Sequence, residues 1–134
     1  MQKTRLALLA AALLLPMPAL ALDPTCDDVT TQAGMNDCAY ADWQTQDALL
    51  NDAYADAMAL LKQWDADLPT ELQGGAVKLR EGQRAWITYR DAACAVEGYA
   101  MRGGSAEPLL VYGCMARLTE SRAKDLQEMV DAYR

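Results

Sequence analysis

The 134-residue sequence contains no histidine, which removes the Ser-His and Cys-His pairs of nucleophilic catalysis together with histidine-based zinc sites. It also lacks a C-x-x-C redox pair and the spacings typical of nucleotide and DNA binding. The acidic stretch from Asp65 is no calcium loop, because Thr70 and Ala76 occupy the positions of the turn glycine and the closing glutamate. Paired carboxylates leave acid–base catalysis open in principle, but without a pocket they are more simply a solvated face. We therefore predict a protein that is not an enzyme and that holds no metal and no cofactor.

Long apolar runs are also missing, apart from one at the N-terminus. Lys3 and Arg5 precede ten apolar residues at positions 6–15, and the Ala-Leu-Ala of residues 19–21 has the small residues of a cleavage site. Ten residues are too few to cross a bilayer as a helix. We expect a signal peptide over residues 1–21 and a mature chain, residues 22–134, with no membrane span. The protein is then periplasmic or secreted.

Basic residues are scarce relative to acidic ones. The chain has 12 Lys and Arg against 19 Asp and Glu, and removal of the leader leaves 10 against 19, a net charge of −9. Such a surface repels nucleic acid and anionic lipid, so we expect neither as a partner. It favours a basic protein partner, although the same charge also serves simply to keep a secreted protein soluble.

Runs of β-branched residues are absent, and Ala, Leu, Gln, Glu, Asp and Arg dominate, which predicts helices almost throughout. Apolar residues recur at three- and four-residue steps in three segments: about residues 31–64, 70–102, and 108 to the end. The second segment opens with Thr70 and Gln73, which have the spacing of a capping box. The predicted fold class is all-α, a small antiparallel three-helix bundle that forms one domain over residues 22–134.

The apolar stripes also predict which side chains lie in the core. Two arginines fall on these stripes, and a guanidinium that faces a core needs an acceptor, for which Asp52 or Asp56 is the predicted partner. The predicted structural core residues are Tyr54, Trp86, Ile87, Arg90, Leu118 and Arg122.

Four cysteines allow three pairings. Cys26 lies in the irregular lead-in to the first helix that contains Cys38, and Cys94 and Cys114 flank the break between the second and third helices. These positions favour the local pairs, Cys26 with Cys38 and Cys94 with Cys114. An extracytoplasmic compartment preserves such disulfides, and each contributes about 3 kcal/mol by constraining the unfolded chain.

A set of motifs spread over nearly the whole mature chain resembles a known family. The motifs are Cys26, TQAGMNDC over residues 31–38, Leu50-Asn51 with Tyr54, QRAWI over 83–87, YRDA over 89–92 with Cys94, Gly104-Ser105, Cys114, and Leu118-Thr119 with Arg122. In order and spacing they resemble the LprI-type lysozyme inhibitor domain. The resemblance implies a small, secreted, disulfide-bonded helical domain, with lysozyme inhibition as its activity.

Two binding hypotheses follow. In the first, the acidic domain is steered toward a basic lysozyme, and the glycine-rich segment between the second and third helices plugs the sugar-binding cleft. Arg102 or Ser105 then donates hydrogen bonds to the two catalytic carboxylates of the target. The predicted partner-binding residues are Tyr99, Arg102, Gly103, Gly104, Ser105 and Glu107. In the second hypothesis, the domain is a periplasmic interaction or envelope-stress adaptor without a lysozyme target, and it binds through Asp47, Asp52, Asp56 and Asp65.

Overall fold

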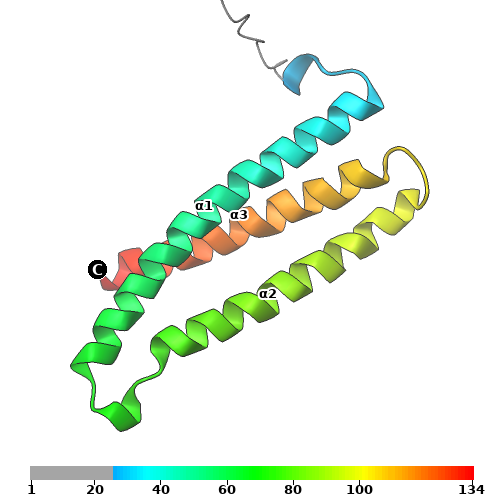
Figure 1. The fold of residues 1–134 in the computed structure, drawn as a ribbon. Coiled ribbons are helices and arrows are strands. Elements are labelled where there is room, and N and C mark those ends of the chain that lie inside the picture. Colours follow the sequence, from blue (N-terminus) through cyan, green and yellow to red (C-terminus); the bar gives the residue numbers. More distant parts are fainter. Residues whose placement is uncertain (1–25) are drawn as a thin grey trace, which may run out of the picture.

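A computed structural model describes residues 26–134 of the protein. Three long helices make up the fold: α1 (Gln32–Asp67), α2 (Gly75–Gly98) and α3 (Glu107–Tyr133). The chain reverses direction after α1 and again after α2, so that α2 runs antiparallel to both of its neighbours (Figure 1). The predicted all-α three-helix bundle is confirmed, whereas the predicted signal peptide lies outside the described residues.

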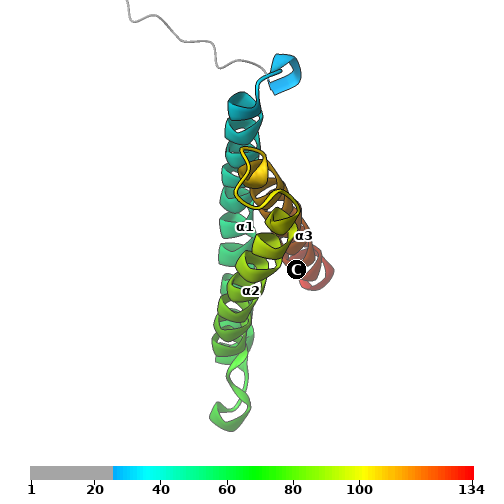
Figure 2. The ribbon, with the colours of Figure 1, turned by 90° about the vertical axis from the view of Figure 1, so that its right-hand side faces the viewer.

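The three helices do not pack equally on one another. The α1–α3 contact is the most extensive, and α2 packs more on α3 than on α1. Figure 2 shows α2 on the outside of the bundle, in front of the other two helices. At 1.5 Å per residue, the 36 residues of α1 span about 54 Å, which makes it the longest of the three. None of the helices formed by the described residues has a long enough apolar stretch to cross a membrane.

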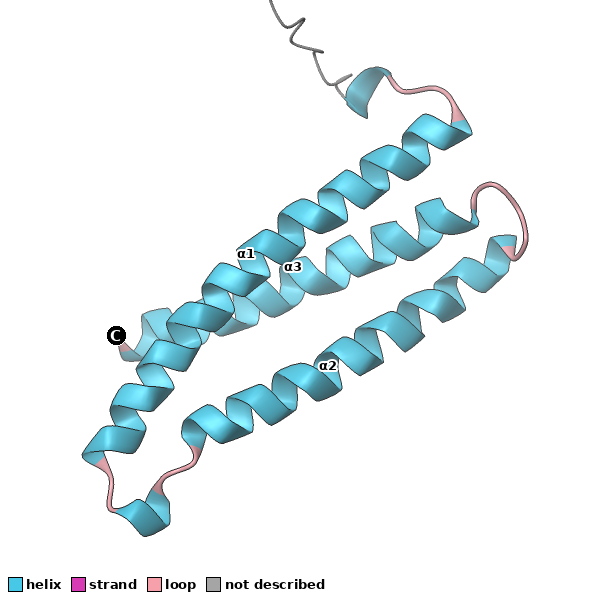
Figure 3. Ribbon diagram, in the orientation of Figure 1, coloured by secondary structure: helices cyan, strands magenta, loops and turns pink. Residues whose placement is uncertain are grey.

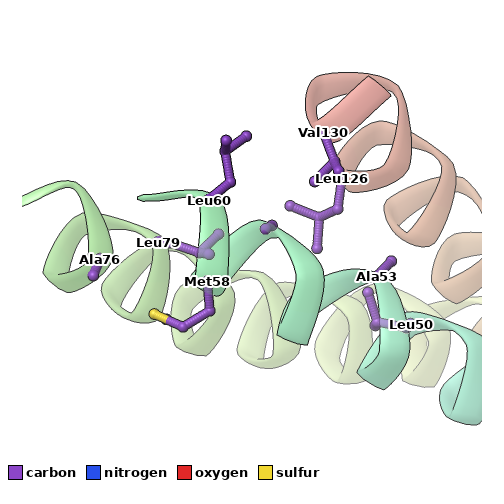
Figure 4. Close-up of a cluster of buried hydrophobic side chains, with 9 residues drawn as sticks. Leu50, Ala53, Met58, Leu60, Ala76, Leu79, Leu126 and Val130 are labelled. Carbon is purple, nitrogen blue, oxygen red and sulfur yellow. The ribbon is translucent and has the colours of Figure 1, made fainter. Parts of the chain in front are cut away.

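One apolar cluster fills the end of the bundle where α1 ends, α2 begins and α3 ends. Its side chains converge from all three helices (Figure 4). They are Leu50, Ala53, Ala57, Met58, Leu60, Ala76, Leu79, Leu126 and Val130. The cluster is rich in alanine on α1, which lets the neighbouring helix backbones approach closely.

A second cluster lies toward the opposite end, around a buried disulfide. Cys94 of α2 and Cys114 of α3 are bonded there and are almost fully buried, and Trp43 and Leu118 pack against them. The other disulfide joins Cys26 to Cys38. Both predicted local pairs are therefore confirmed.

The junction between α1 and α2 differs from the prediction. Residues 70–72 form a short 3-10 turn, and α2 begins only at Gly75, so Thr70 and Gln73 do not cap it. The Asp65 carboxylate instead accepts hydrogen bonds from the backbone N–H groups of Gly74 and Gly75 (both 2.9 Å) and of Ala76 (3.0 Å). The bonds from Ala76, Gly74 and Gly75, in that order, lower the pKa of Asp65. A side chain from the preceding helix therefore replaces the local capping box.

The predicted core residues lie at different depths. Arg90 is buried, and Tyr54, Trp86, Leu118 and Arg122 are half-buried against the two clusters or the neighbouring helices. Ile87 is 40% exposed, so its assignment to the core was wrong. It lies one position beyond Trp86, where the helical rotation of about 100° per residue carries its side chain out of the core stripe.

The predicted acceptors for the two arginines were also wrong. Arg90 Nε donates to Asp91 Oδ1 at 2.9 Å, and Arg90 Nη1 lies 3.4 Å from Asp47 Oδ1, so the partner on α1 lies five residues before Asp52. Arg122 Nε donates to the amide oxygen of Gln83 (3.1 Å).

Candidate partner-binding loop

The segment that the sequence singles out for partner binding joins α2 to α3. It begins with a 3-10 turn over Tyr99–Met101, continues through a tight turn, and ends where α3 starts at Glu107. Figure 3 shows this connection as a loop at the end of the bundle where α1 begins. We call residues 99–107 the α2–α3 loop.

A single carboxylate organises this loop. One oxygen of Glu107 accepts from Arg102 Nη1 (2.5 Å), and the other accepts from the backbone N–H of Gly103 (2.7 Å). The Gly103 bond, followed by the Arg102 bond, lowers the pKa of Glu107, and the same ion pair raises the pKa of Arg102. Gly103 adopts φ +75°, a left-handed conformation that favours glycine. Glu107 therefore ties the start of α3 to the tip of the loop.

Two further contacts fix the loop to the bundle. Asn36 Nδ2 on α1 donates to the backbone oxygen of Ser105 (2.9 Å). At the base of the loop, the Cys94–Cys114 disulfide joins α2 to α3. Gly98 ends α2 so close to α3 that a Cβ at this position would lie 2.6 Å from Val111 Cγ2. The chain around the loop is thus held by a disulfide, by close helix packing and by a long-range hydrogen bond.

The outward side of the loop carries both polar and apolar groups. Tyr99 is 63% exposed and Met101 is 52% exposed, and the Arg102 guanidinium lies 4.9 Å from the centre of the Tyr99 ring. The Arg102 side chain remains 63% exposed although it is paired. A guanidinium has five N–H donors, so one ion pair leaves it with donors for a partner. Beside the loop lies a groove of about 450 Å³ lined by Gly103, Gly104, Glu107, Pro108, Val111 and Tyr112.

The acidic residues of the adaptor hypothesis have different surroundings. Asp47 faces Arg90, Asp65 caps α2, and Asp56 lies 3.5 Å from the guanidinium of Arg134. Three of these four carboxylates are therefore engaged within the molecule. Residues 26–134 contain no group of three or more acidic or cysteine side chains placed to hold a metal ion.

The family model described as lysozyme inhibitor LprI matches residues 25–126. The chain belongs to this family. An uncharacterized protein of Rhizobium meliloti (strain 1021) is 38% identical over 113 residues, which cover 82% of this chain and 81% of that protein.

A solved structure supports the fold of this LprI family member. The crystal structure of a DUF1311 family protein from Pseudomonas putida KT2440 matches with a TM-score of 0.64 and 24% identity. The match covers 75% of this chain and 94% of that one. At this level of identity the similarity concerns the helical architecture alone.

Some contacts of the loop could not be found by sequence reasoning. Asn36 and Ser105 are 69 positions apart, and neither lies in a local motif that signals their bond. The role of Glu107 had a weak signal, because an acidic residue in the first turn of a helix is favoured by the helix dipole. That preference does not reveal that the same carboxylate also binds Arg102 and Gly103.

Proposed function

We propose that this protein inhibits lysozyme by inserting the α2–α3 loop into the substrate-binding cleft of the enzyme. The observation that supports this proposal most directly is the pair of hydrogen bonds that the Glu107 carboxylate accepts from Arg102 and Gly103. These bonds shape the loop before a partner binds. A preformed loop loses less conformational entropy on binding than a flexible one. Membership in the LprI lysozyme inhibitor family supplies the class of target.

In this proposal Arg102 and Ser105 donate hydrogen bonds to the carboxylates in the cleft, and the exposed ring of Tyr99 packs beside them. The protein acts as an inhibitor and not as an enzyme, in the periplasm or outside the cell, where its two disulfides persist. The net charge of −7 for the whole chain becomes −9 without residues 1–21, and this charge steers the protein toward a basic lysozyme.

The test is an inhibition and binding experiment on chicken-type and goose-type lysozymes with a matched pair of double variants. Arg102→Ala/Ser105→Ala removes the two proposed donors. Arg117→Ala/Ser121→Ala removes the same residue types from α3, where Arg117 is 60% exposed and pairs with Glu97 at 2.6 Å. Both variants change the net charge equally, so electrostatic steering changes by the same amount in each. A difference between them therefore reports the contacts of the loop.

We expect the loop variant to dissociate at least about 100-fold faster, because two hydrogen bonds to charged groups, each worth about 1.5–3 kcal/mol, are lost together. The α3 variant should dissociate like the wild type. Raising the ionic strength from about 10 mM to about 150 mM should slow association for all three proteins and leave dissociation unchanged. An unaltered off-rate for the loop variant would exclude the loop as the site, and absence of binding to either lysozyme would favour the adaptor hypothesis.

A further inference from the structure

The outer face of α2, together with Tyr99 in the turn that follows it, carries a second regular stripe, opposite the one that faces the core. Its residues are Ala85, Tyr89, Ala92, Val96 and Tyr99, which follow one another in steps of 4, 3, 4 and 3. All five are exposed, and the three large ones retain 63%, 69% and 63% of their surface for Tyr89, Val96 and Tyr99. We call this set the outer stripe. Steps of this kind keep side chains on one helix face, which is the pattern of a helix that packs on another helix.

No described element covers the outer stripe. Figure 2 shows α2 on the outside of the bundle. The buried residues of α2, among them Leu79, Arg90 and Cys94, fall on the opposite side of the helix from the stripe. The exposed residues that flank the stripe between its two tyrosines include Thr88 and Ala95, which are uncharged as well. From Ala85 to Val96 the result is a band without charged side chains on a strongly acidic protein, and the Arg102 guanidinium lies over the Tyr99 ring at its end.

We infer that the outer stripe is a self-association surface, on which α2 packs antiparallel against α2 of a second copy. A twofold axis near Ala92 places Tyr89 opposite Val96 of the partner and Tyr99 opposite the partner's Ala85. Tyr89 then packs on the smaller Val96, Tyr99 packs on Ala85, and each of these contacts occurs twice. A single patch that is complementary to itself is what a twofold interface requires.

Charge also favours a second copy over other occupants. A basic protein finds no carboxylate among the stripe residues with which to pair, and an anionic lipid surface is repelled by the net charge of the chain. Two copies repel each other through their net charge as well, but salt screens that repulsion and leaves the apolar contact intact.

The size of the stripe sets the strength of the dimer. A whole aromatic side chain buries about 150–250 Å², so the exposed parts of Tyr89 and Tyr99 contribute roughly 100–150 Å² each. With Val96 and the alanines, each copy contributes the few hundred Å² of a functional apolar patch, so two copies together stay below the roughly 1,200 Å² of a standard interface, in the range of weak, transient contacts. The dimer is therefore weak and in exchange with the monomer.

The test is sedimentation equilibrium of the mature protein from about 5 µM to 500 µM, the range in which a dissociation constant of about 10–100 µM becomes visible. Val96→Glu places a charge on the stripe and should weaken the dimer at least about tenfold. Val77→Glu is the matched control: Val77 is also on α2 and 48% exposed, but an antiparallel partner centred on Ala92 does not reach it. Tyr89→Lys should weaken the dimer as well, although it makes the net charge less negative where Val96→Glu makes it more negative. The two variants together separate loss of the apolar contact from a change in net charge.

Circular dichroism on each variant checks that the fold is kept. Raising the salt from about 50 mM to about 500 mM should strengthen the wild-type dimer, the opposite of its expected effect on association with a basic lysozyme. No lysozyme is present, so the result is independent of the proposed function. A wild type that stays monomeric at every concentration and salt, or a Val77→Glu variant that dissociates as readily as Val96→Glu, would overturn the inference.

Discussion

At the scale of single residues, the Arg90 side chain links the three helices. It lies on α2, and its guanidinium reaches Asp47 on α1 and the hydroxyl of Thr119 on α3 (3.3 Å). The rings of Trp43 and Trp86 lie 5.6 and 5.2 Å from its central carbon. One side chain therefore contacts groups from all three helices, with the planar geometry that suits arginine and not lysine.

We predict that Arg90→Ala lowers the free energy of unfolding by about 3 kcal/mol, because packing, two ring contacts and the Thr119 bond are lost together. Arg90→Lys should recover only part of this loss. Arg117→Ala, which removes an exposed arginine from a surface pair, should stay within about 0.5 kcal/mol of the wild type. Urea unfolding followed by circular dichroism measures all three, and equal midpoints for Arg90→Ala and Arg117→Ala would contradict the structural role of Arg90.

The sequence predicted that Arg90 faces the core, but it did not predict which groups accept hydrogen bonds from its guanidinium. Its place on the stripe follows from the 3.6-residue period, which is a local property of α2. The choice of Asp47 over Asp52 depends on the axial offset between α1 and α2, and no pattern within either helix encodes that offset. The buried Nε1 of Trp43, which has no partner within the described residues, is equally a product of this packing and was invisible in the sequence.

At the scale of helices, the existence of each element was predictable, and the ends were less so. Pro69 disfavours a helical conformation in the residue before it, which is the C-cap Leu68, so a local steric effect sets the end of α1. The start of α2 was placed too early, because the Asp65 carboxylate on α1 offers three backbone N–H groups a better acceptor than the Thr70 side chain does. Tertiary caps of this kind override local capping signals.

Glycines on α2 provide a test of how closely α2 and α3 pack. Gly82 has open space around it, so Gly82→Ala should raise the free energy of unfolding by about 0.5–1 kcal/mol through better helix propensity. At Gly98 a methyl group would collide with Val111, and Gly98→Ala should instead lower it by about 1–3 kcal/mol. Thermal unfolding would reveal the opposite signs. The double variant Gly98→Ala/Val111→Ala should regain part of the loss, and a stabilising Gly98→Ala would show that the helices are further apart than described.

At the scale of the whole molecule, the two disulfides secure different parts of the bundle. Cys26–Cys38 ties a short lead-in to the first turns of α1, and Cys26 is exposed. Cys94–Cys114 joins two helices inside the core beside the α2–α3 loop. Cys94 exposes 0% of its surface and Cys114 exposes 2%. The sequence predicted both pairs from their positions near the helix ends. The difference in burial could not be predicted, because it depends on how α1 covers the α2–α3 pair.

This difference predicts an order of reduction. A reducing thiolate must reach a sulfur atom, so under native conditions Cys26–Cys38 should open first and Cys94–Cys114 only when the bundle unfolds. Alkylation at timed intervals, followed by peptide mass spectrometry, identifies which pair has opened.

The sequence separations of 12 and 20 residues give both disulfides a similar entropic contribution of about 3 kcal/mol, so chain entropy alone predicts similar losses of stability from removing either one. Cys94→Ala/Cys114→Ala should nevertheless destabilise the protein more than Cys26→Ala/Cys38→Ala, because it also leaves a cavity in the core. Simultaneous reduction of both pairs in the folded protein, or equal stability of the two variants, would mean that the core around Cys94 and Cys114 opens as readily as the N-terminal lead-in.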